Sequence, residues 1–288
     1  KKILLRKYLK QKCPLENLLN IYMLKINNKS NPLISILIAN YNNKNRLIRS
    51  IKSCFDQNYK NIEVIVFDDC STDGSQNIIK KIKKIKKIFN KKKNYISYLD
   101  SMNAYLKMFK ISRGKFIFLL DSDDFFSSKK ISTLINFYLK NPKIQFIQDA
   151  PKVIIRQKTY IKNKNFFFSR WPYFSPTSCL SMKKNFFKEF IKYNKSLKFK
   201  FSDVWLDFRL CAYSFFKRKS FFFYNLPLTS YDQTQSSNQS NTYFKFKLNW
   251  TLRRYFSHLY INNFYKKKNI INIDFIFTKF VYKIFYEK

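Results

Sequence analysis

Apolar residues recur along the chain in two alternating patterns. Three continuous runs, rich in β-branched and aromatic side chains, are typical of buried strands and lie at residues 33–39, 62–67 and 116–120. Four segments repeat apolar residues every three or four positions and predict amphipathic helices at residues 46–55, 76–89, 102–111 and 129–139. A weaker strand is predicted near residues 96–99. This alternation predicts a mostly parallel, doubly wound α/β sheet over residues 33–140.

The rest of the chain is less regular and suggests the domain organisation. Residues 1–31 predict a helical preface, residues 32–140 a ligand-binding half, residues 141–243 a second half, and residues 244–288 a basic, aromatic helical segment. Within the last segment, residues 270–286 have the spacing of an amphipathic helix. Core packing and a membrane-surface role are both open for that helix.

Charge and composition narrow the possible partners. The 288 residues include 57 Lys and Arg against 17 Asp and Glu, a formal net charge of +40. Because the basic residues are spread along the chain, without a zinc-finger spacing or an RNP-like signature, we expect attraction to anionic phosphates or lipid headgroups rather than specific nucleic-acid recognition. A basic nucleic-acid-binding protein on an α/β scaffold remains an alternative from another class.

Cysteine usage and hydropathy bear on the compartment. Five cysteines without a Cys-x-x-Cys pair predict reduced thiols rather than a disulfide framework. No apolar run reaches the roughly 18 residues that a spanning helix needs, and no signal peptide is recognisable. We therefore expect a cytoplasmic protein that is at most peripheral on the inner face of the cytoplasmic membrane.

Polar clusters follow the three predicted strands directly, after Ala39, Phe67 and Leu120. The carboxyl ends of parallel strands form the ligand-binding edge of an open α/β sheet, so these clusters should converge. The last of them is Asp121-Ser122-Asp123-Asp124, three acids in a chain that has few. Crowded carboxylates repel unless a cation lies between them, and oxygen ligands of this kind suit Mg²⁺ or Mn²⁺. A capped turn before the next helix is the alternative.

The other two clusters suggest a nucleotide. Tyr41 has a ring on which a base can stack, and Asp69 can accept hydrogen bonds from a base or ribose. The only two glycines are Gly74, in a turn for which we expect positive φ, and Gly114, for which we expect an ordinary tight turn. A chain with two glycines cannot form a P-loop or a dinucleotide-binding fingerprint.

Taken together, these motifs resemble the family 2 glycosyltransferases, which have the GT-A fold. The segments that carry the resemblance are Asn40-Tyr41-Asn42, Gln57-Asn58-Tyr59, residues 63–75 (EVIVFDDCSTDGS), Gly114-Lys115-Phe116-Ile117 and Asp121-Ser122-Asp123-Asp124. The resemblance covers residues 33–140 tightly and continues more loosely to about residue 240.

The resemblance implies inverting transfer from a nucleotide-diphosphate sugar, usually a UDP-sugar, with Mn²⁺ or Mg²⁺ as cofactor. It implies an acceptor hydroxyl on a glycan or a lipid-linked glycan of a bacterial surface polysaccharide or lipooligosaccharide. Asp121 and Asp123 fall on the metal-binding DxD pair. The residues implied for the nucleotide and donor are Ala39, Asn40, Tyr41, Asp69, Asp121, Ser122 and Asp124, with Asp69 at the base and Asp124 toward the sugar.

Family members also carry an aspartate before a helix in the acceptor half, where it serves as catalytic base. Asp203 falls at that place, six residues before Arg209, and Asp207, one helical turn further, is the second choice. Such a carboxylate takes the proton of the attacking hydroxyl. Trp205 is predicted to stack on an acceptor sugar, with a place in the core as the alternative.

The sequence departs from the family pattern at three places. Ser202 replaces the usual acidic partner of the base, and residues 102–113 lack the usual Arg-Asn pair. The late segment Tyr231-Asp232-Gln233-Thr234 lacks the Arg and His of the family motif. These departures keep a third hypothesis open, a catalytically inactive relative that acts as a partner subunit.

Overall fold

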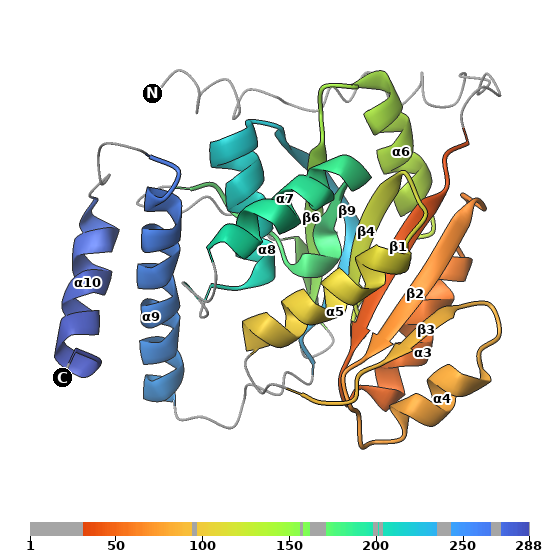
Figure 1. Cartoon of the computed structure of the whole chain (residues 1–288), viewed down its shortest axis with the longest axis horizontal. Helices are drawn as coiled ribbons and strands as arrows, with labels where there is room; N and C mark the ends of the chain where they lie inside the picture. Colours follow the sequence, from red (N-terminus) through yellow and green to blue (C-terminus); the bar gives the residue numbers. More distant parts are fainter. Residues whose placement is uncertain are drawn as a thin grey trace. The chain divides into compact units, whose positions relative to one another are not determined.

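The computed structural model describes residues 31–93, 97–155, 158–161, 171–197, 201, 204–234, 243–265 and 272–287 (Figure 1). The chain divides into two compact units, residues 1–31 and 32–288. The predicted helical preface therefore falls almost wholly outside the described residues. The other predicted boundaries lie inside the second unit and remain predictions.

The described strands form one mixed sheet in the order β3-β2-β1-β4-β8-β6-β9-β5, with β7 beside β6. Their bounds are β1 Ile34–Asn40, β2 Ile62–Asp68, β3 Lys86–Phe89, β4 Phe116–Asp121, β5 Phe125–Phe126, β6 Phe146–Ile155, β7 Lys158–Ile161, β8 Leu180–Lys183 and β9 Phe221–Asp232. Strands β3, β2, β1 and β4 are parallel, β8 is antiparallel to β4, and β6 is parallel to β9. The predicted mostly parallel α/β sheet is confirmed.

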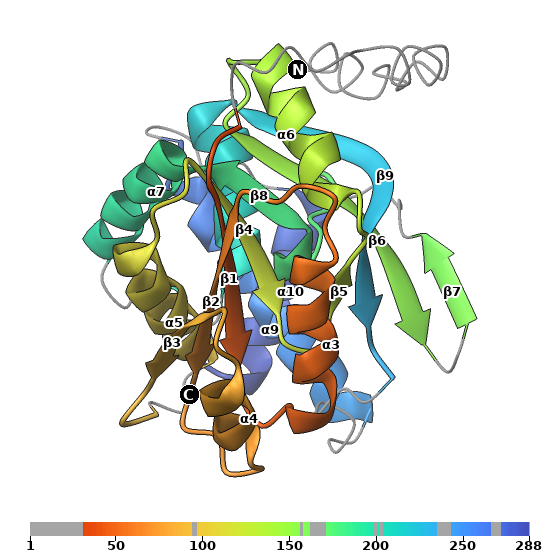
Figure 2. The ribbon, with the colours of Figure 1, turned by 90° about the vertical axis from the view of Figure 1, so that its right-hand side faces the viewer.

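Helices cover both faces of the sheet (Figures 1 and 2). The face covered by α3, α4 and α6 receives Ile36 and Ile38 of β1, whereas Leu37 points to the face covered by α5, α7 and α8. The helix bounds are α3 Lys44–Phe55, α4 Ser75–Lys81, α5 Ser97–Ile111, α6 Lys130–Lys140, α7 Lys184–Ser196, α8 Leu206–Ala212, α9 Tyr243–Asn262 and α10 Ile273–Phe285.

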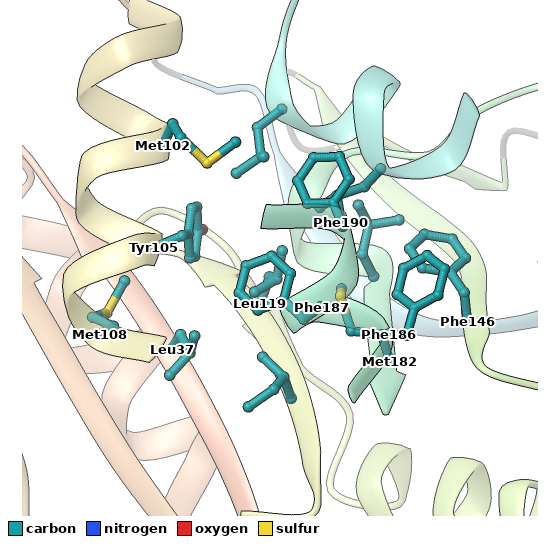
Figure 3. Packing of buried hydrophobic residues seen from close by; sticks show 14 of the residues in the cluster. Leu37, Met102, Tyr105, Met108, Leu119, Phe146, Met182, Phe186, Phe187 and Phe190 are labelled. Carbon is teal, nitrogen blue, oxygen red and sulfur yellow. The ribbon is translucent and has the colours of Figure 1, made fainter. Parts of the chain in front are cut away.

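A large aromatic cluster fills the second face (Figure 3). Phe186, Phe187 and Phe190 of α7 are fully buried there, together with Met102 and Tyr105 of α5. Burying a large side chain of this kind stabilises the fold by about 1.5–3 kcal/mol. The cluster holds α5 firmly against β4.

Two predictions about the region after β2 are wrong. The helix predicted over residues 76–89 ends at Lys81, where Ile82 becomes extended, and Lys86–Phe89 instead form β3, parallel to β2. The open edge of β2 supplies backbone partners to this segment, and such tertiary contacts outweigh local helical spacing. The strand predicted near residues 96–99 is not formed, because residues 97–99 begin α5.

Glycine is required at positions 74 and 114 for different structural reasons. Gly74 has φ +89°, a left-handed conformation that L side chains rarely adopt, so the expected positive φ is confirmed. Gly114 does not have positive φ. A Cβ there would lie 2.4 Å from the backbone nitrogen of Ser35, so only glycine lets the start of β4 approach β1 this closely. Gly114 is therefore more than the ordinary turn residue that we expected.

Candidate active site

The three polar clusters meet at one edge of the sheet. Ala39 at the end of β1 lies in register with Phe67 of β2 on one side and with Asp121 of β4 on the other. The backbone N–H of Asp69 donates to the carbonyl of Asn40, and that of Ser122 donates to the carbonyl of Ala39. The expected convergence is therefore confirmed, and it follows from the parallel register of β1, β2 and β4.

A cavity of about 370 Å³ opens at this edge. Its lining includes four residues that the sequence predicts for the nucleotide, Ala39, Asn40, Tyr41 and Asp69. The lining is completed by Phe67, Lys93, Asp100, Ser101 and Ala104. The last three belong to α5, and sequence analysis missed Asp100 and Ser101 because it placed a strand just before that helix.

Lys93 is a further lining residue that no sequence signal separates from the neighbouring lysines. Its ammonium lies 3.4 Å from the carboxylate of Asp69 and 2.8 Å from the centroid of the Tyr41 ring. Asp69 also accepts a hydrogen bond of 2.7 Å from the amide of Asn90. A base that stacks on this face of Tyr41 therefore requires Lys93 to move.

Asn40 is held at the base of the cavity. It is buried, and its amide nitrogen donates to Asp68 at 2.8 Å and to Ser71 at 3.2 Å. Its amide oxygen is buried without a hydrogen-bond partner in the described part of the chain. The backbone after it turns sharply, with positive φ at Asn42. This turn fixes the direction in which Tyr41 leaves β1.

Residues 121–124, called the acidic loop below, carry three carboxylates, and those of Asp121 and Asp123 are held less firmly by the described residues than that of Asp124. Asp121 accepts a side-chain hydrogen bond of 3.1 Å from the hydroxyl of Tyr105. Burial, and secondarily the charge of Asp123, raise the pKa of Asp121 to about 7. The side chain of Asp123 is 37% exposed and lies 3.9 Å from the guanidinium of Arg46. Between them, buried Ser122 accepts a hydrogen bond of 3.1 Å from Asn43.

Asp124 has a structural role in the acidic loop. It is fully buried, and one carboxylate oxygen accepts a hydrogen bond from the hydroxyl of Ser178 while the other accepts one of 2.9 Å from the backbone of Asp232. Asp232 is itself held by Arg49 at 2.6 Å. The Asp124 carboxylate therefore joins the acidic loop to the end of β9, and its predicted place toward the donor sugar remains a prediction. This contact also brings the late segment of the family motif beside the acidic loop.

The acidic loop suits a divalent cation that is shared with a substrate phosphate. Among the described residues, no group of three or more His, Cys, Asp or Glu side chains is disposed to hold a metal ion. Mg²⁺ commonly uses only one or two carboxylates together with substrate phosphates, and Asp121 and Asp123 supply such a pair. Burial first and the charge of Asp123 second raise the pKa of Asp121, and a cation held between the two carboxylates would lower it.

Comparison with known proteins identifies the family. The sequence model described as "Glycosyl transferase family 2" matches residues 35–222, more than half of the chain. The chain belongs to glycosyl transferase family 2. The match begins in β1 and ends in β9, so it includes the cavity and the acidic loop.

Curated relatives match part of this family 2 chain. A UDP-Glc:alpha-D-GlcNAc-diphosphoundecaprenol beta-1,3-glucosyltransferase of Escherichia coli, WfaP, is 37% identical over 46% of this chain and 48% of its own length. A poly(ribitol-phosphate) beta-N-acetylglucosaminyltransferase of Staphylococcus aureus, TarP, is 30% identical over 58% of this chain and 52% of its own length. The chain thus spans about half the length of these relatives.

Solved structures confirm the GT-A fold of this family 2 chain. S. aureus TarS 1-349 in complex with UDP-GlcNAc superposes with a TM-score of 0.58, at 14% identity, over 88% of this chain and 73% of that chain. The mannosyltransferase PcManGT from Pyrobaculum calidifontis, in complex with GDP-Man and Mn²⁺, gives a TM-score of 0.53 at 10% identity, over 79% of this chain and 63% of that chain.

Of the two candidate bases of the family 2 site, Asp207 lies among the described residues and Asp203 does not. Asp203, the first choice, and its neighbour Ser202 lie outside the described residues. Asp207 lies in the first turn of α8, and burial raises its pKa to about 6. Its charge contributes to raising the pKa values of Asp121 and Tyr105, so Asp207 and Asp121 are close enough to interact electrostatically.

Arg209, six residues after Asp203, is a structural residue. It is fully buried, and its guanidinium donates to the backbone carbonyls of Phe201 and Val204 and to Asn194 of α7. These contacts fix both described ends of the segment that carries Asp203. Trp205 follows that segment at the N-cap of α8, with the guanidinium of Arg253 4.3 Å from its ring centroid. Its predicted contact with an acceptor remains a prediction.

A buried ion pair is connected to the acidic loop through Ser178. No pattern in the sequence predicts this pair. Lys130 and Asp149 are both fully buried, 2.9 Å apart. The Lys130 ammonium also donates to the carbonyl of Ser178 at 2.7 Å and to the hydroxyl of Thr229 at 2.6 Å. The Ser178 hydroxyl in turn contacts the backbone of Asp121 and the carboxylate of Asp124. This network therefore connects α6, β6 and β9 to the acidic loop.

Proposed function

We propose that this chain transfers a sugar from a UDP-sugar, with inversion, to a hydroxyl of a glycan or lipid-linked glycan of the bacterial surface. The observation that most directly supports this proposal is the cavity at the ends of β1 and β2, beside the acidic loop, in a chain of this family. The names of WfaP and TarP, which act on a diphosphoundecaprenol-linked sugar and on poly(ribitol-phosphate), support such acceptors. The UDP-GlcNAc complex of TarS supports the choice of UDP.

In the proposed reaction, the acceptor oxygen attacks the anomeric carbon of the donor sugar. The bond from that carbon to the diphosphate breaks, UDP leaves with the bonding electrons, and the hydroxyl proton passes to an aspartate. Asp121 and Asp123 would hold Mn²⁺ or Mg²⁺, which offsets the negative charge that develops on the leaving diphosphate. Tyr41 and Asp69 bind the nucleoside in the cavity.

The first test is nucleotide binding. At a UDP concentration of about 100 times its Kd, we expect about 2.7 kcal/mol of stabilisation, which raises the Tm by roughly 5–10 °C. The stabilisation should be larger with Mn²⁺ than with EDTA, and GDP should give less. The control pair is Asp69→Asn, which should lose most of the shift, and Asp56→Asn at the exposed end of α3, which should keep it. A chain that UDP does not stabilise under any of these conditions contradicts the proposal.

The second test separates the two candidate bases. Asp203→Asn is expected to lower kcat by about 10²–10⁴-fold while leaving the UDP-induced Tm shift intact. If Asp207 is the base instead, Asp207→Asn has that effect, and the wild-type rate rises with pH up to about 6 and then levels, because only the ionised carboxylate accepts a proton. Full activity in both variants would remove the acceptor-half aspartates from the mechanism. Donor binding without any transfer in the wild type would favour the inactive-partner hypothesis.

A further inference from the structure

The outermost helix, α10, packs against α9 (Figure 1). Side-chain contacts between the two helices determine which face of α10 is turned toward α9. Asp274, in its first turn, accepts hydrogen bonds from Arg254 at 2.7 Å and contacts His258 at 2.6 Å, both on α9. Tyr282, two turns later, stacks on Tyr255 of α9 with ring centroids 4.7 Å apart. Because polar and aromatic contacts hold both ends of the helix, its opposite face points away from the protein.

That opposite face is apolar. Five large side chains recur at spacings of three, one, three and four residues, which places them on one stripe of the helix. Their exposed fractions are 75% for Ile273, 58% for Ile276, 58% for Phe277, 62% for Phe280 and 57% for Ile284. A helix on the surface of a soluble domain normally presents polar residues there. A contiguous apolar stripe on a rigid helix marks an interaction surface.

Basic and aromatic residues border the stripe. Lys279 and Lys283 are exposed, one turn apart, along one side of it. At the C-terminal end, Tyr286 contacts Asn249 of α9, next to Trp250, whose side chain is 48% exposed. An apolar face with lysines beside it and a Trp at its edge is the pattern of helices that lie in the interface of an anionic membrane.

We propose that the outward face of α10 binds the surface of an anionic lipid bilayer, with Ile276, Phe277 and Phe280 among the acyl chains and Lys279 and Lys283 at the headgroups. The formal net charge of +40 complements such a surface. No described helix has both the length and the apolar character required to cross a membrane. The inference goes beyond the proposed function, since it does not depend on the donor or on the reaction.

The size of the stripe disfavours a second copy of the chain as its occupant. A helix of 13 residues is about 20 Å long and about 10 Å wide. Two such faces in contact would bury a few hundred Å², well below the roughly 1,200 Å² at which stable interfaces begin. A bilayer has no such minimum, because each exposed apolar side chain gains independently by insertion.

The test is co-sedimentation of the full chain with vesicles, either pure phosphatidylcholine or phosphatidylcholine with about one third phosphatidylglycerol. We expect binding to the anionic vesicles and little to the neutral ones. Ile276→Ser combined with Phe280→Ser should weaken binding by at least about tenfold. The matched control is Ile48→Ser combined with Leu139→Ser, two exposed apolar residues on α3 and α6, which should not change it.

A second pair of double variants tests whether binding depends on the lysines of α10 or only on the net charge of the chain. Lys279→Gln with Lys283→Gln should weaken binding by roughly fivefold per lysine, about 25-fold in total. Lys83→Gln with Lys84→Gln changes the net charge equally, at exposed positions between α4 and β3, and should have little effect. Equal losses in the two pairs, or no wild-type binding to anionic vesicles, would overturn the proposal.

Thermal unfolding and light scattering separate loss of membrane binding from loss of folding and from self-association. All variants should retain the wild-type Tm and the UDP-induced Tm shift, because the substituted side chains are exposed and lie outside the cavity. That shift also distinguishes failure of the membrane proposal from failure of the proposed function. If the wild type is dimeric by light scattering, and the α10 variants are monomeric and bind vesicles as the wild type does, the stripe is a protein interface instead.

Discussion

Asp123→Asn is expected to lower kcat for sugar transfer by about 100- to 1,000-fold. The substitution keeps the size of the side chain and removes one of the two carboxylates available for a divalent cation. The Asp123 carboxylate contributes little to holding the fold, since its side chain is 37% exposed and its ion pair with Arg46 of α3 is long, at 3.9 Å. The Tm without ligand should therefore stay close to the wild-type value. The additional Tm shift that Mn²⁺ gives in the presence of UDP should disappear.

The control for this prediction is the neighbouring acid. Asp124→Asn also removes one negative charge from the loop, but it disturbs the hydrogen bonds with Ser178 and Asp232, so it should lower the Tm without ligand. A variant pair with the opposite pattern, in which Asp123→Asn destabilises and Asp124→Asn does not, would contradict these roles. Metal-dependent transfer at the wild-type rate by Asp123→Asn would leave Asp121 as the ligand and refute the role of Asp123.

The sequence predicts those parts of the site that depend on the local pattern of apolar and polar residues. β1, β2 and β4 are continuous apolar runs that end in polar residues, and the parallel register alone brings Ala39, Asp69 and Asp121 to one edge. Each of these residues lies at the end of its strand or directly after it, so an error of one or two residues in the strand bounds does not move it away from this edge.

The rest depends on partners that are distant in the sequence. Asp124 is distinguished from Asp123 only by contacts with Ser178 and Asp232, which are 54 and 108 residues away. Residues 86–89 have helical spacing, and they become a strand because β2 offers a free edge. Lys93 is one lysine among many until Asp69 and Tyr41 are placed beside it. In each case the local pattern leaves two outcomes open, and tertiary contacts select one.

Lys130→Met is expected to lower the free energy of unfolding by about 3–5 kcal/mol. The Asp149 carboxylate is fully buried, and burial raises its pKa even with Lys130 as a partner. Without the ammonium it becomes an uncompensated buried charge, to which the hydroxyl of Thr229 and the thiol of Cys179 donate neutral hydrogen bonds. Because natural domains are stable by about 5–15 kcal/mol, this loss is a large fraction of the total and should be evident in urea unfolding.

The matched control is Lys129→Met, the adjacent exposed lysine, for which we expect a change within about 0.5 kcal/mol. Lys130→Met combined with Asp149→Leu should recover most of the stability, because a buried pair replaced by apolar residues leaves no unpaired charge. A double variant that loses the sum of the two single effects would show that the two residues act independently. Since Lys130 also binds the carbonyl of Ser178, the double variant should remain less active than the wild type even where its stability is restored. Stability and activity then report separately on the ion pair and on the loop that it supports.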